Sequence, residues 1–500
     1  MNSENPPVVT TTAGAVRGIQ REGSAAFLGI PFAEAPVGDL RFAAPVPHAA
    51  WHGVRDATEY GATPQRKGLM EVTLIPEPSY RGESTLNLNV FTPSPATDAA
   101  LPVLVYIHGG GFVAGSPSSP WYDGAAFNRD GIVTVSVSYR LGFDGFGWIE
   151  DAPHNRGVLD WLLALEWVRD NIAAFGGDPE RVTIAGQSAG GAAVMTLLSM
   201  PRAQSLFSRA YAISAPIANI SLAQAEEFGR RLAADLGVAP TRAGLSTLTE
   251  EEILSAQGRL APMGQDAEPS PDGPPSDPIA GLRGFLGGGL PLAPVTDGDL
   301  IPEPTLDALR SGVGADKRLV LGTTDDEFSM ILTGAKDALE QVPAEAILGQ
   351  LGLGGENLTD YVAANEPGRH TADVIGRFVT DKMFRTSALL ISRARGEAPT
   401  WLYRFSWPSP AFGAAVHCLD MPFFFDCLTA DRVEALAGPK PPQPLADEVH
   451  GDVVAFVRDG NPGWPGFDAA TESAMVFDTP SHVEKHAYVA VEALLPVSVA

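Results

Sequence analysis

The sequence predicts an α/β fold in which a central, mostly parallel sheet is flanked by helices. The first observation is that short apolar segments, typical of buried strands, occur at residues 103–107, 181–186, 319–322 and 400–407. The second is that each segment runs into a glycine-rich or polar loop, and that residues 189–198 have the pattern of a helix. Strands that alternate with loops and helices in this way are typical of a parallel sheet.

The segment around Ser188 is a Gly-x-Ser-x-Gly motif between the strand at 181–186 and the helix at 189–198. A serine in so sharp a turn has strained backbone geometry, and the flanking Gly186 and Gly190 remove Cβ atoms that would clash. The turn exposes the hydroxyl above the edge of the sheet. We interpret the motif as a nucleophile elbow with Ser188 as the nucleophile, and the alternative is an ordinary glycine turn.

A second motif lies upstream, where an apolar strand runs directly into His-Gly-Gly-Gly-Phe at residues 108–112. Acyl transfer places negative charge on the former carbonyl oxygen, and backbone N–H groups aimed at that oxygen stabilise it. Gly110, Gly111 and Ala189 are the candidate oxyanion donors, whereas we expect His108 to anchor the loop. A flexible loop is the alternative, but the two motifs together predict the α/β-hydrolase fold.

A serine nucleophile needs a base, and in this fold the base is a histidine that follows the serine and the acid along the chain. Five histidines lie downstream of the serine: His370, His417, His450, His482 and His486. His417 lies in a loop after a predicted strand, where catalytic groups of this fold belong. We expect His482 and His486 at the surface, His370 before a helix, and His450 in an exposed or capping position on a helix. Position alone favours His417 without excluding the others.

The acid is expected in the loop after the strand at 319–322, where Asp325, Asp326 and Glu327 follow one another. All three carboxylates are within reach of the same turn, and position alone does not choose among them. We expect the two that do not orient the histidine to cap a helix or to face solvent.

Further segments carry a family resemblance that extends from residue 8 to about residue 480. They are Gly-Ile-Pro-Phe-Ala at 29–33, Leu-Asn-Val-Phe-Thr-Pro at 88–93, Ser-Tyr-Arg-Leu-Gly at 138–142, and residues 155–179, which end in Phe-Gly-Gly-Asp-Pro. With the elbow and the glycine loop, these segments resemble the type-B carboxylesterase family, which includes cholinesterases and bacterial para-nitrobenzyl esterases.

The resemblance implies a role for each candidate residue. Ser188 matches the nucleophile of a catalytic triad, Glu327 matches its acid and His417 its base. The N–H groups of the oxyanion hole match those of Gly110, Gly111 and Ala189. We therefore expect Glu327→Gln to impair turnover strongly and Asp325→Asn to impair it mildly.

The same resemblance implies structural contacts away from the reacting atoms. Arg41 with Glu83 and Arg140 with Asp160 match ion pairs that hold the scaffold together. Ser214 matches a buried serine close to the triad, which we expect to support the acid.

The sequence departs from the family pattern at several positions. Gln187 stands before the nucleophile where a glutamate is usual, Phe328 follows the acid where a glycine is usual, and Asp420 replaces a glutamate after the histidine. Thr85 occupies the position of a cysteine in the family's first disulfide. Gln187 and the stretch 413–422 are also similar to bacterial phenylcarbamate hydrolases of the same family, which is a hint about substrate.

Composition excludes several other kinds of function. The 60 acidic and 34 basic residues give a net charge of −26, which argues against binding to nucleic acid. Apolar runs are too short to span a membrane, and the N-terminal residues lack the pattern of a signal peptide, so we expect a cytoplasmic protein. Cys418 and Cys427 are then expected to be reduced thiols, and they form no metal site.

The candidate site residues come from widely separated parts of the chain, so early and late strands must share one sheet. We therefore expect one domain over residues 8–485 with inserted lobes, and the 45% of hydrophobic residues suffices for its core. Residues 261–291 are rich in proline and glycine. We expect them to form a lid over the pocket or a disordered surface loop.

The sequence thus predicts a serine hydrolase that cleaves carboxylic esters of small to medium apolar or aromatic substrates through an acyl-enzyme. No cofactor is implied, and we expect a monomer or homodimer. Phe112, Phe143 and Phe328 are expected to line the substrate pocket. The first alternative is an aryl carbamate or amide hydrolase on the same triad, and a non-catalytic binding protein or a lyase on this fold are the others.

Overall fold

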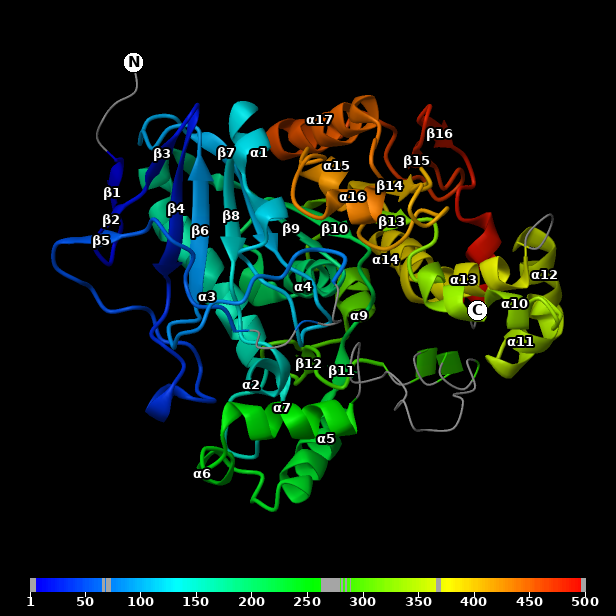
Figure 1. Cartoon of the computed structure of the whole chain (residues 1–500), viewed down its shortest axis with the longest axis horizontal. Coiled ribbons are helices and arrows are strands. Elements are labelled where there is room, and N and C mark those ends of the chain that lie inside the picture. The colour runs from blue at the N-terminus through cyan, green and yellow to red at the C-terminus, as the bar shows by residue number, and fades with distance from the viewer. Residues whose placement is uncertain are drawn as a thin grey trace.

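The computed structural model describes residues 6–64, 68, 73–261, 279, 282–283, 286–287, 289–365 and 370–495. In that part of the chain, eleven strands form one sheet through the middle of the molecule (Figure 1). From one edge to the other they are β16 (His482–Glu484), β15 (Ala474–Phe477), β14 (Thr400–Phe405), β13 (Arg318–Thr324), β10 (Arg209–Ile213), β9 (Gly177–Gln187), β7 (Leu101–Ile107), β8 (Val133–Val137), β6 (Asn87–Thr92), β4 (Ser24–Pro31) and β3 (Ile19–Arg21).

The central strands, from β15 to β8, lie parallel to their neighbours. The strands at the two edges pair antiparallel, β16 on one side and β6, β4 and β3 on the other. The central strands are apolar and buried along almost their whole length, because helices cover both faces of the sheet. The predicted mostly parallel sheet is confirmed.

Alternate residues of β7 enter two different cores, one on each face of the sheet. Val103, Val105 and Ile107 pack in the larger core, and Leu104 and Tyr106 pack in the second. The helices of the larger core include α3 (Arg156–Asn171), α4 (Ala189–Leu198) and α14 (Thr386–Arg395). The second core includes α15 (Met421–Phe424), α16 (Val433–Ala437) and α17 (Gln443–Asp459).

Two helical lobes extend from the body of the molecule (Figure 1). The lobe at the bottom of the view contains α5 (Leu222–Asp235), α6 (Arg242–Leu245) and α7 (Glu250–Leu260), and α2 (Gly142–Phe146) contacts α7. The lobe at the right contains α10 (Lys336–Leu339), α11 (Ala344–Gln350), α12 (Gly355–Asn365) and α13 (Thr371–Thr380). This second lobe has an apolar core of its own, and a π-helical turn, Asp381–Arg385, joins α13 to α14.

The remaining strands and α-helices of the described residues are short. They are β1 (Val8–Thr10), β2 (Ala15–Arg17) and β5 (Val54–Asp56) in one small sheet, β11 (Ile220–Ser221) and β12 (Val295–Thr296) in another, and the helices α1 (Ala125–Arg129) and α9 (Thr305–Arg310).

The strands and helices that carry the predicted site lie where the sequence placed them, with shifts at their ends. The strand predicted at 181–186 is longer, as β9, and the strand predicted at 400–407 ends at Phe405 as β14. The insert predicted at 261–291 lies mostly outside the described residues, and the domain bounds stay a prediction. Within the described chain, no helix combines the length and apolarity that a membrane span requires.

Candidate active site

Ser188 lies in the sharp turn between β9 and α4. Its backbone has φ 58° and ψ −122°, a conformation that residues other than glycine rarely adopt. The surrounding chain holds it there, because its N–H donates to the carbonyl of Ile213 on β10 at 2.9 Å and its carbonyl accepts from Ala192 at 2.9 Å. The turn therefore has the strained geometry expected of a nucleophile elbow.

The two glycines of the motif are required by close backbone packing. A Cβ on Gly190 would lie 2.0 Å from the carbonyl oxygen of Ile107, and one on Gly186 would lie 2.4 Å from the carbonyl oxygen of Gly190. Both distances are far below van der Waals contact. The spacing of the motif thus follows from how tightly α4 returns against β9 and β7.

The glycine loop after β7 lies directly beside the elbow. A Cβ on Gly109 would be 2.7 Å from the carbonyl oxygen of Gln187 and 3.2 Å from the Cβ of Ser188. In the part of the chain that the structure describes, the N–H groups of the three expected oxyanion donors donate to no protein acceptor: Gly110, Gly111 and Ala189. Such free donors beside Ser188 suit the binding of an anionic oxygen.

His108 anchors this loop, as the sequence predicts. Its ring stacks on Tyr139 with 4.5 Å between the centroids, and its Nδ1 donates to the carbonyl of Gly109 at 2.8 Å. The Tyr139 hydroxyl donates to the carbonyl of His108 at 2.9 Å. Burial lowers the pKa of His108 to about 4, so the ring is neutral at pH 7 and holds the loop as an uncharged group.

A histidine–glutamate pair lies in the loops after β13 and β14. Nδ1 of His417 donates to Oε2 of Glu327 at 2.5 Å, and the two backbones are joined by a hydrogen bond of 2.7 Å from His417 N–H to the Glu327 carbonyl. Oε1 of Glu327 accepts from the N–H of Thr324 at 2.9 Å. Glu327 is fully buried and His417 is 5% exposed. Of the three consecutive acids, Glu327 alone contacts His417 among the described residues.

The surroundings of His417 favour its charged form. Burial disfavours an imidazolium, but the carboxylate of Glu327 outweighs this effect and holds the pKa of His417 well above the usual 6.5. Burial also raises the pKa of the Cys418 thiol, which is therefore neutral at pH 7. Glu327 is thus the charge that the imidazole faces under ordinary conditions.

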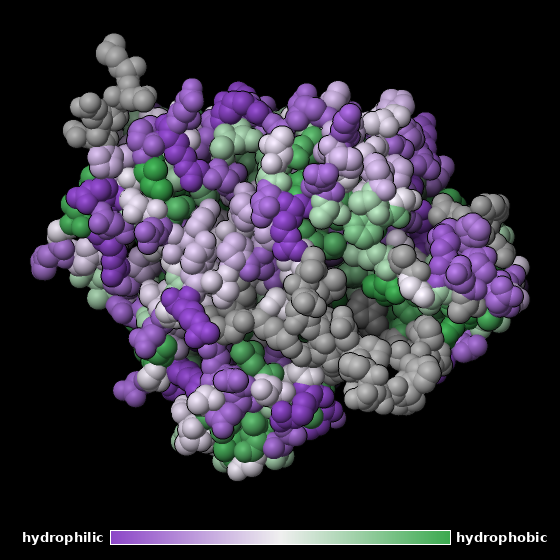
Figure 2. Space-filling model, viewed as in Figure 1, coloured by the Kyte–Doolittle hydropathy of each residue, from purple (hydrophilic) through white to green (hydrophobic). Residues whose placement is uncertain are grey.

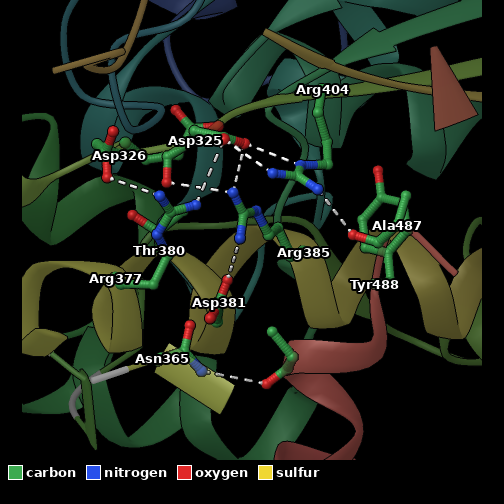
Figure 3. Close-up of polar contacts among 12 residues, drawn as sticks. Asp325, Asp326, Asn365, Arg377, Thr380, Asp381, Arg385, Arg404, Ala487 and Tyr488 are labelled. Atoms are coloured by element: carbon green, nitrogen blue, oxygen red, sulfur yellow. Dashed lines mark hydrogen bonds and ion pairs between the residues drawn. The ribbon is translucent and has the colours of Figure 1, made fainter. Parts of the chain in front are cut away.

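Asp325 lies at the centre of a buried ion cluster (Figure 3). Its carboxylate accepts from Arg404 at 2.8 and 2.9 Å, also pairs with Arg385, and lies 3.5 Å from Arg377. Burial would raise the pKa of Asp325, but the three guanidinium groups hold it well below its usual range. We call this group the Asp325 cluster.

The Asp325 cluster joins four parts of the fold to the acid loop. Arg377 comes from α13, Arg385 from the π-helical turn and Arg404 from β14, and Arg404 also donates to the carbonyl of Ala487 near the C-terminus (Figure 3). Asp326 pairs with Arg377 at 3.2 Å. The expectation that Asp325 and Asp326 cap a helix or face solvent is therefore wrong, because Asp325 is buried among the arginines and the partly exposed Asp326 pairs with one of them.

The structure also corrects the prediction for His450. This histidine is 2% exposed rather than at the surface or a cap. Its Nδ1 donates to the carbonyl of Phe424 at 2.8 Å, and its Nε2 lies 3.1 Å from Asp130. His450 therefore joins α17 to α15 and α1, away from Ser188, whereas His482 and His486 are exposed as predicted.

The implied structural contacts are partly confirmed. Arg140 and Asp160 form a buried pair with contacts of 2.8 and 2.9 Å. Arg41 does not pair with Glu83 among the described residues; it lies 3.9 Å from Asp144 and donates to the carbonyl of Leu248. The expected ion pair is wrong because the chain turns Arg41 toward α2 instead.

Ser214 does not support Glu327. Within the described chain the Ser214 hydroxyl is buried without a hydrogen-bond partner, and Oε1 of Glu327 is held by Thr324 N–H. The position of Ser214 at the end of β10 is determined by its backbone, which donates to the carbonyl of Gly322 at 2.7 Å.

Two of the three expected pocket residues lie in the core. The Phe112 ring is fully buried against Phe146 and Trp161, and the Phe143 ring packs against Phe42. The prediction that they line the pocket is wrong, because both rings are buried within the larger core.

Phe328, the third expected pocket residue, lies beside the histidine. Its ring centroid is 4.6 Å from that of His417, and a second ring, Phe384 of the π-helical turn, is 5.4 Å away. No motif in the sequence indicates Phe384, since it lies within a continuous helical pattern. Gln187, which departs from the family pattern, also reaches the histidine, because its Nε2 lies 3.0 Å from Nε2 of His417.

An elbow serine, a buried histidine–glutamate pair and free amide donors, all at one edge of a mostly parallel sheet, define a serine hydrolase with the α/β-hydrolase fold. Comparison with known proteins sharpens the assignment. The model of the carboxylesterase family matches residues 5–489, so the chain belongs to the carboxylesterase family of carboxylic ester hydrolases.

Relatives and solved structures agree over nearly the whole chain. The chain is 33% identical to the para-nitrobenzyl esterase of Bacillus subtilis (strain 168), over 95% of this chain and 96% of that protein. It is 33% identical to the phenmedipham hydrolase of Pseudarthrobacter oxydans, over 94% of each. The Geobacillus stearothermophilus carboxylesterase EST55 has a TM-score of 0.82 at 32% identity, over 98% of this chain and 100% of that one.

Proposed function

We propose that this carboxylesterase-family enzyme cleaves carboxylic esters of small to medium apolar or aromatic substrates through an acyl-enzyme on Ser188. The observation that carries the proposal is the buried hydrogen bond of 2.5 Å between His417 and Glu327, next to the strained turn of Ser188. A histidine held by a carboxylate beside an elbow serine is the arrangement that activates a hydroxyl for attack.

The proposed reaction begins when the Ser188 hydroxyl attacks the ester carbonyl and Nε2 of His417 takes its proton. Glu327 holds the ring by Nδ1 and stabilises the imidazolium that forms. The N–H groups of Gly110, Gly111 and Ala189 bind the oxyanion. His417 then protonates the leaving alcohol, and water attacks the acyl-enzyme in the same way.

The surroundings of His417 support an apolar substrate. The rings of Phe328 and Phe384 lie beside the imidazole, 5.6 Å from each other. On the face seen in Figure 2, apolar side chains border a hollow next to the lobe of α10 to α13. An alkyl or aryl group buried against such side chains gains about 25 cal/mol for each Å² removed from water.

An aryl carbamate or amide hydrolase on the same triad is the second candidate. It is supported by the similarity to phenmedipham hydrolase and by Gln187, which contacts His417. A non-catalytic binding role is disfavoured because Ser188, Glu327 and His417 are all in place. Lyase chemistry is disfavoured because the relatives named above are esterases and a hydrolase. A cytoplasmic location and a monomer or homodimer stay predictions.

The test compares para-nitrophenyl butyrate with an aryl N-phenylcarbamate, using the wild type and Ser188→Ala. We expect the wild type to turn over the ester and Ser188→Ala to lose nearly all of this activity while it stays folded. Turnover of both compounds would assign the enzyme to carbamate cleavage as well, whereas inactivation by the carbamate would make it an ester hydrolase only. Full activity of Ser188→Ala would refute the proposal.

A further inference from the structure

Gln187 is the last residue of β9 and makes a buried contact with His417. Its side chain is 2% exposed, and its Nε2 lies 3.0 Å from Nε2 of the histidine. The backbone of Gln187 is fixed on both sides, because it pairs with Ile213 of β10 and its carbonyl lies against Gly109 of the glycine loop. The carboxamide therefore projects from a rigid strand end toward the ring.

The contact involves the nitrogen that the proposed mechanism needs. Since Nδ1 of His417 donates to Glu327, the neutral ring has its lone pair on Nε2, and this lone pair accepts from the Gln187 amide. Among the described residues, the Ser188 hydroxyl makes no hydrogen bond to His417. In the unliganded enzyme the base is thus held by Gln187 and not by the nucleophile.

The NH₂ end of the Gln187 carboxamide faces Nε2 and donates to the neutral ring. In this orientation it disfavours a proton on Nε2, because two donors would then face each other. A carboxylate at this position only accepts, so it favours the imidazolium. A thioether of the same length makes neither strong hydrogen bond.

The other groups around His417 leave this role to Gln187. Glu327 faces Nδ1 from the loop after β13, and Cys418 adjoins the ring from its own loop. Asp420, further along that loop, accepts from the Tyr403 hydroxyl at 2.8 Å; burial and the nearby Glu327 raise its pKa to about 7. The uncharged rings of Phe328 and Phe384 also lie beside the imidazole.

We propose that Gln187 is a positioning residue that holds Nε2 of His417 in the neutral, proton-accepting form and releases it to Ser188 when substrate enters. This inference rests on the proposed function, in which His417 is the base. In this role Gln187 counteracts the effect of Glu327 on the protonation of His417, because the charge of Glu327 favours the imidazolium. The residue before the nucleophile thereby determines the pH at which the base becomes available.

The first test is the pH dependence of kcat/KM for para-nitrophenyl butyrate in the wild type, Gln187→Met and Gln187→Glu. The midpoint of the acid limb should rise by about one pH unit or more in Gln187→Glu, because a carboxylate beside the ring stabilises its proton. Gln187→Met, matched in length, should give a smaller rise in the same direction. A uniform loss of kcat/KM at every pH, with unchanged midpoints, would mean a structural role and overturn the inference.

A second measurement does not depend on turnover. The Nδ1 proton in the short hydrogen bond to Glu327 should give a downfield proton NMR resonance, whose titration reports the charge of His417. We expect its midpoint to increase from wild type to Gln187→Met to Gln187→Glu, each in a Ser188→Ala background. Equal midpoints would overturn the role of Gln187, whereas ordered midpoints combined with no turnover of para-nitrophenyl butyrate by the wild type would refute the proposed function alone.

Discussion

Asp325 and Glu327 lie two residues apart in one loop, and both are buried, but their partners differ in kind. Asp325 faces the guanidinium groups of Arg377, Arg385 and Arg404, which stay charged at any ordinary pH. Glu327 faces one imidazole, which gains and loses a proton during the proposed reaction. Burial and charge alone therefore do not mark a catalytic acid; the partner that can gain or lose a proton does.

The carboxylate of Asp325 stabilises the fold, whereas that of Glu327 stabilises the positive charge that forms on His417. In the Asp325 cluster, the carboxylates of Asp325, Asp326 and Asp381 balance three guanidinium groups, so their charges hold α13, β14 and the acid loop together (Figure 3). The charge of Glu327 has no such permanent counterpart in the contacts described. It is available for the positive charge that His417 acquires during the proposed reaction.

Glu327→Gln should give the largest effect on turnover. The amide keeps the volume but loses the charge that holds Nδ1–H and stabilises the imidazolium, so we expect kcat for para-nitrophenyl butyrate to fall by about 10³–10⁴-fold. The thermal unfolding midpoint should change little. If Asp325→Asn lowered kcat of the folded enzyme more than Glu327→Gln does, Asp325 and not Glu327 would be the catalytic acid.

Asp325→Asn should instead act on stability. Neutralising Asp325 leaves buried guanidinium groups without their shared counter-charge, which costs about 3–5 kcal/mol of unfolding free energy. We still expect Asp325→Asn to lower kcat of the folded enzyme only mildly, as the sequence predicts. The loss of stability is a further expectation, which follows from the ion cluster. Denaturant unfolding of this variant, followed beside Glu327→Gln, measures the difference.

The stability effect of Asp325 has a definite pH dependence. Because the folded-state pKa lies well below the unfolded value of about 3.9, the stabilisation is fully present above that value and is lost as the pH falls toward the folded pKa. The gap in stability between wild type and Asp325→Asn should therefore narrow below about pH 4. A gap that stays constant down to pH 2 would contradict the ion cluster as its cause.

The acid limb of the activity profile distinguishes the same two residues. Turnover requires neutral His417, whose pKa is raised above 6.5, so kcat/KM should increase with pH through a midpoint above that value. Removing the Glu327 charge should lower the midpoint for the residual activity. Asp325→Asn should leave it unchanged, because the Asp325 charge is balanced by its arginines. A larger shift in Asp325→Asn would show that the cluster acts on the base.

The features that could be predicted from the sequence are those that depend on local contacts. The elbow and the glycine loop are local: Gly186, Ser188 and Gly190 are required by contacts within a few residues and with one adjacent strand, so the motif alone places them. The α/β sheet follows from strands that are apolar along their length. By contrast, Asp325, Asp326 and Glu327 are equivalent within the loop, and the resemblance to a family was needed to choose.

What the sequence could not provide were long-range contacts. The arginines that surround Asp325 come from α13, the π-helical turn and β14, at 52 to 79 residues' distance, and no local pattern pairs them. The same holds for His450, which a surface helix pattern placed in solvent but which packs against Phe127 and Asp130. Phe112 was misjudged because a phenylalanine beside a glycine loop can point to either side of it.

Ser406→Ala should give the smallest effect on stability, and it measures what a neutral hydrogen-bond donor contributes to Asp325. The Ser406 hydroxyl donates to Oδ2 of Asp325 at 2.9 Å, so its loss removes one neutral donor while all three arginines stay. We expect a cost of about 1 kcal/mol in unfolding free energy and no change in kcat. In an Asp325→Asn background the same substitution should cost less, since the hydroxyl then faces an uncharged amide. Equal costs in both backgrounds would show that Ser406 stabilises the loop by packing and that the cluster acts through its ion pairs alone.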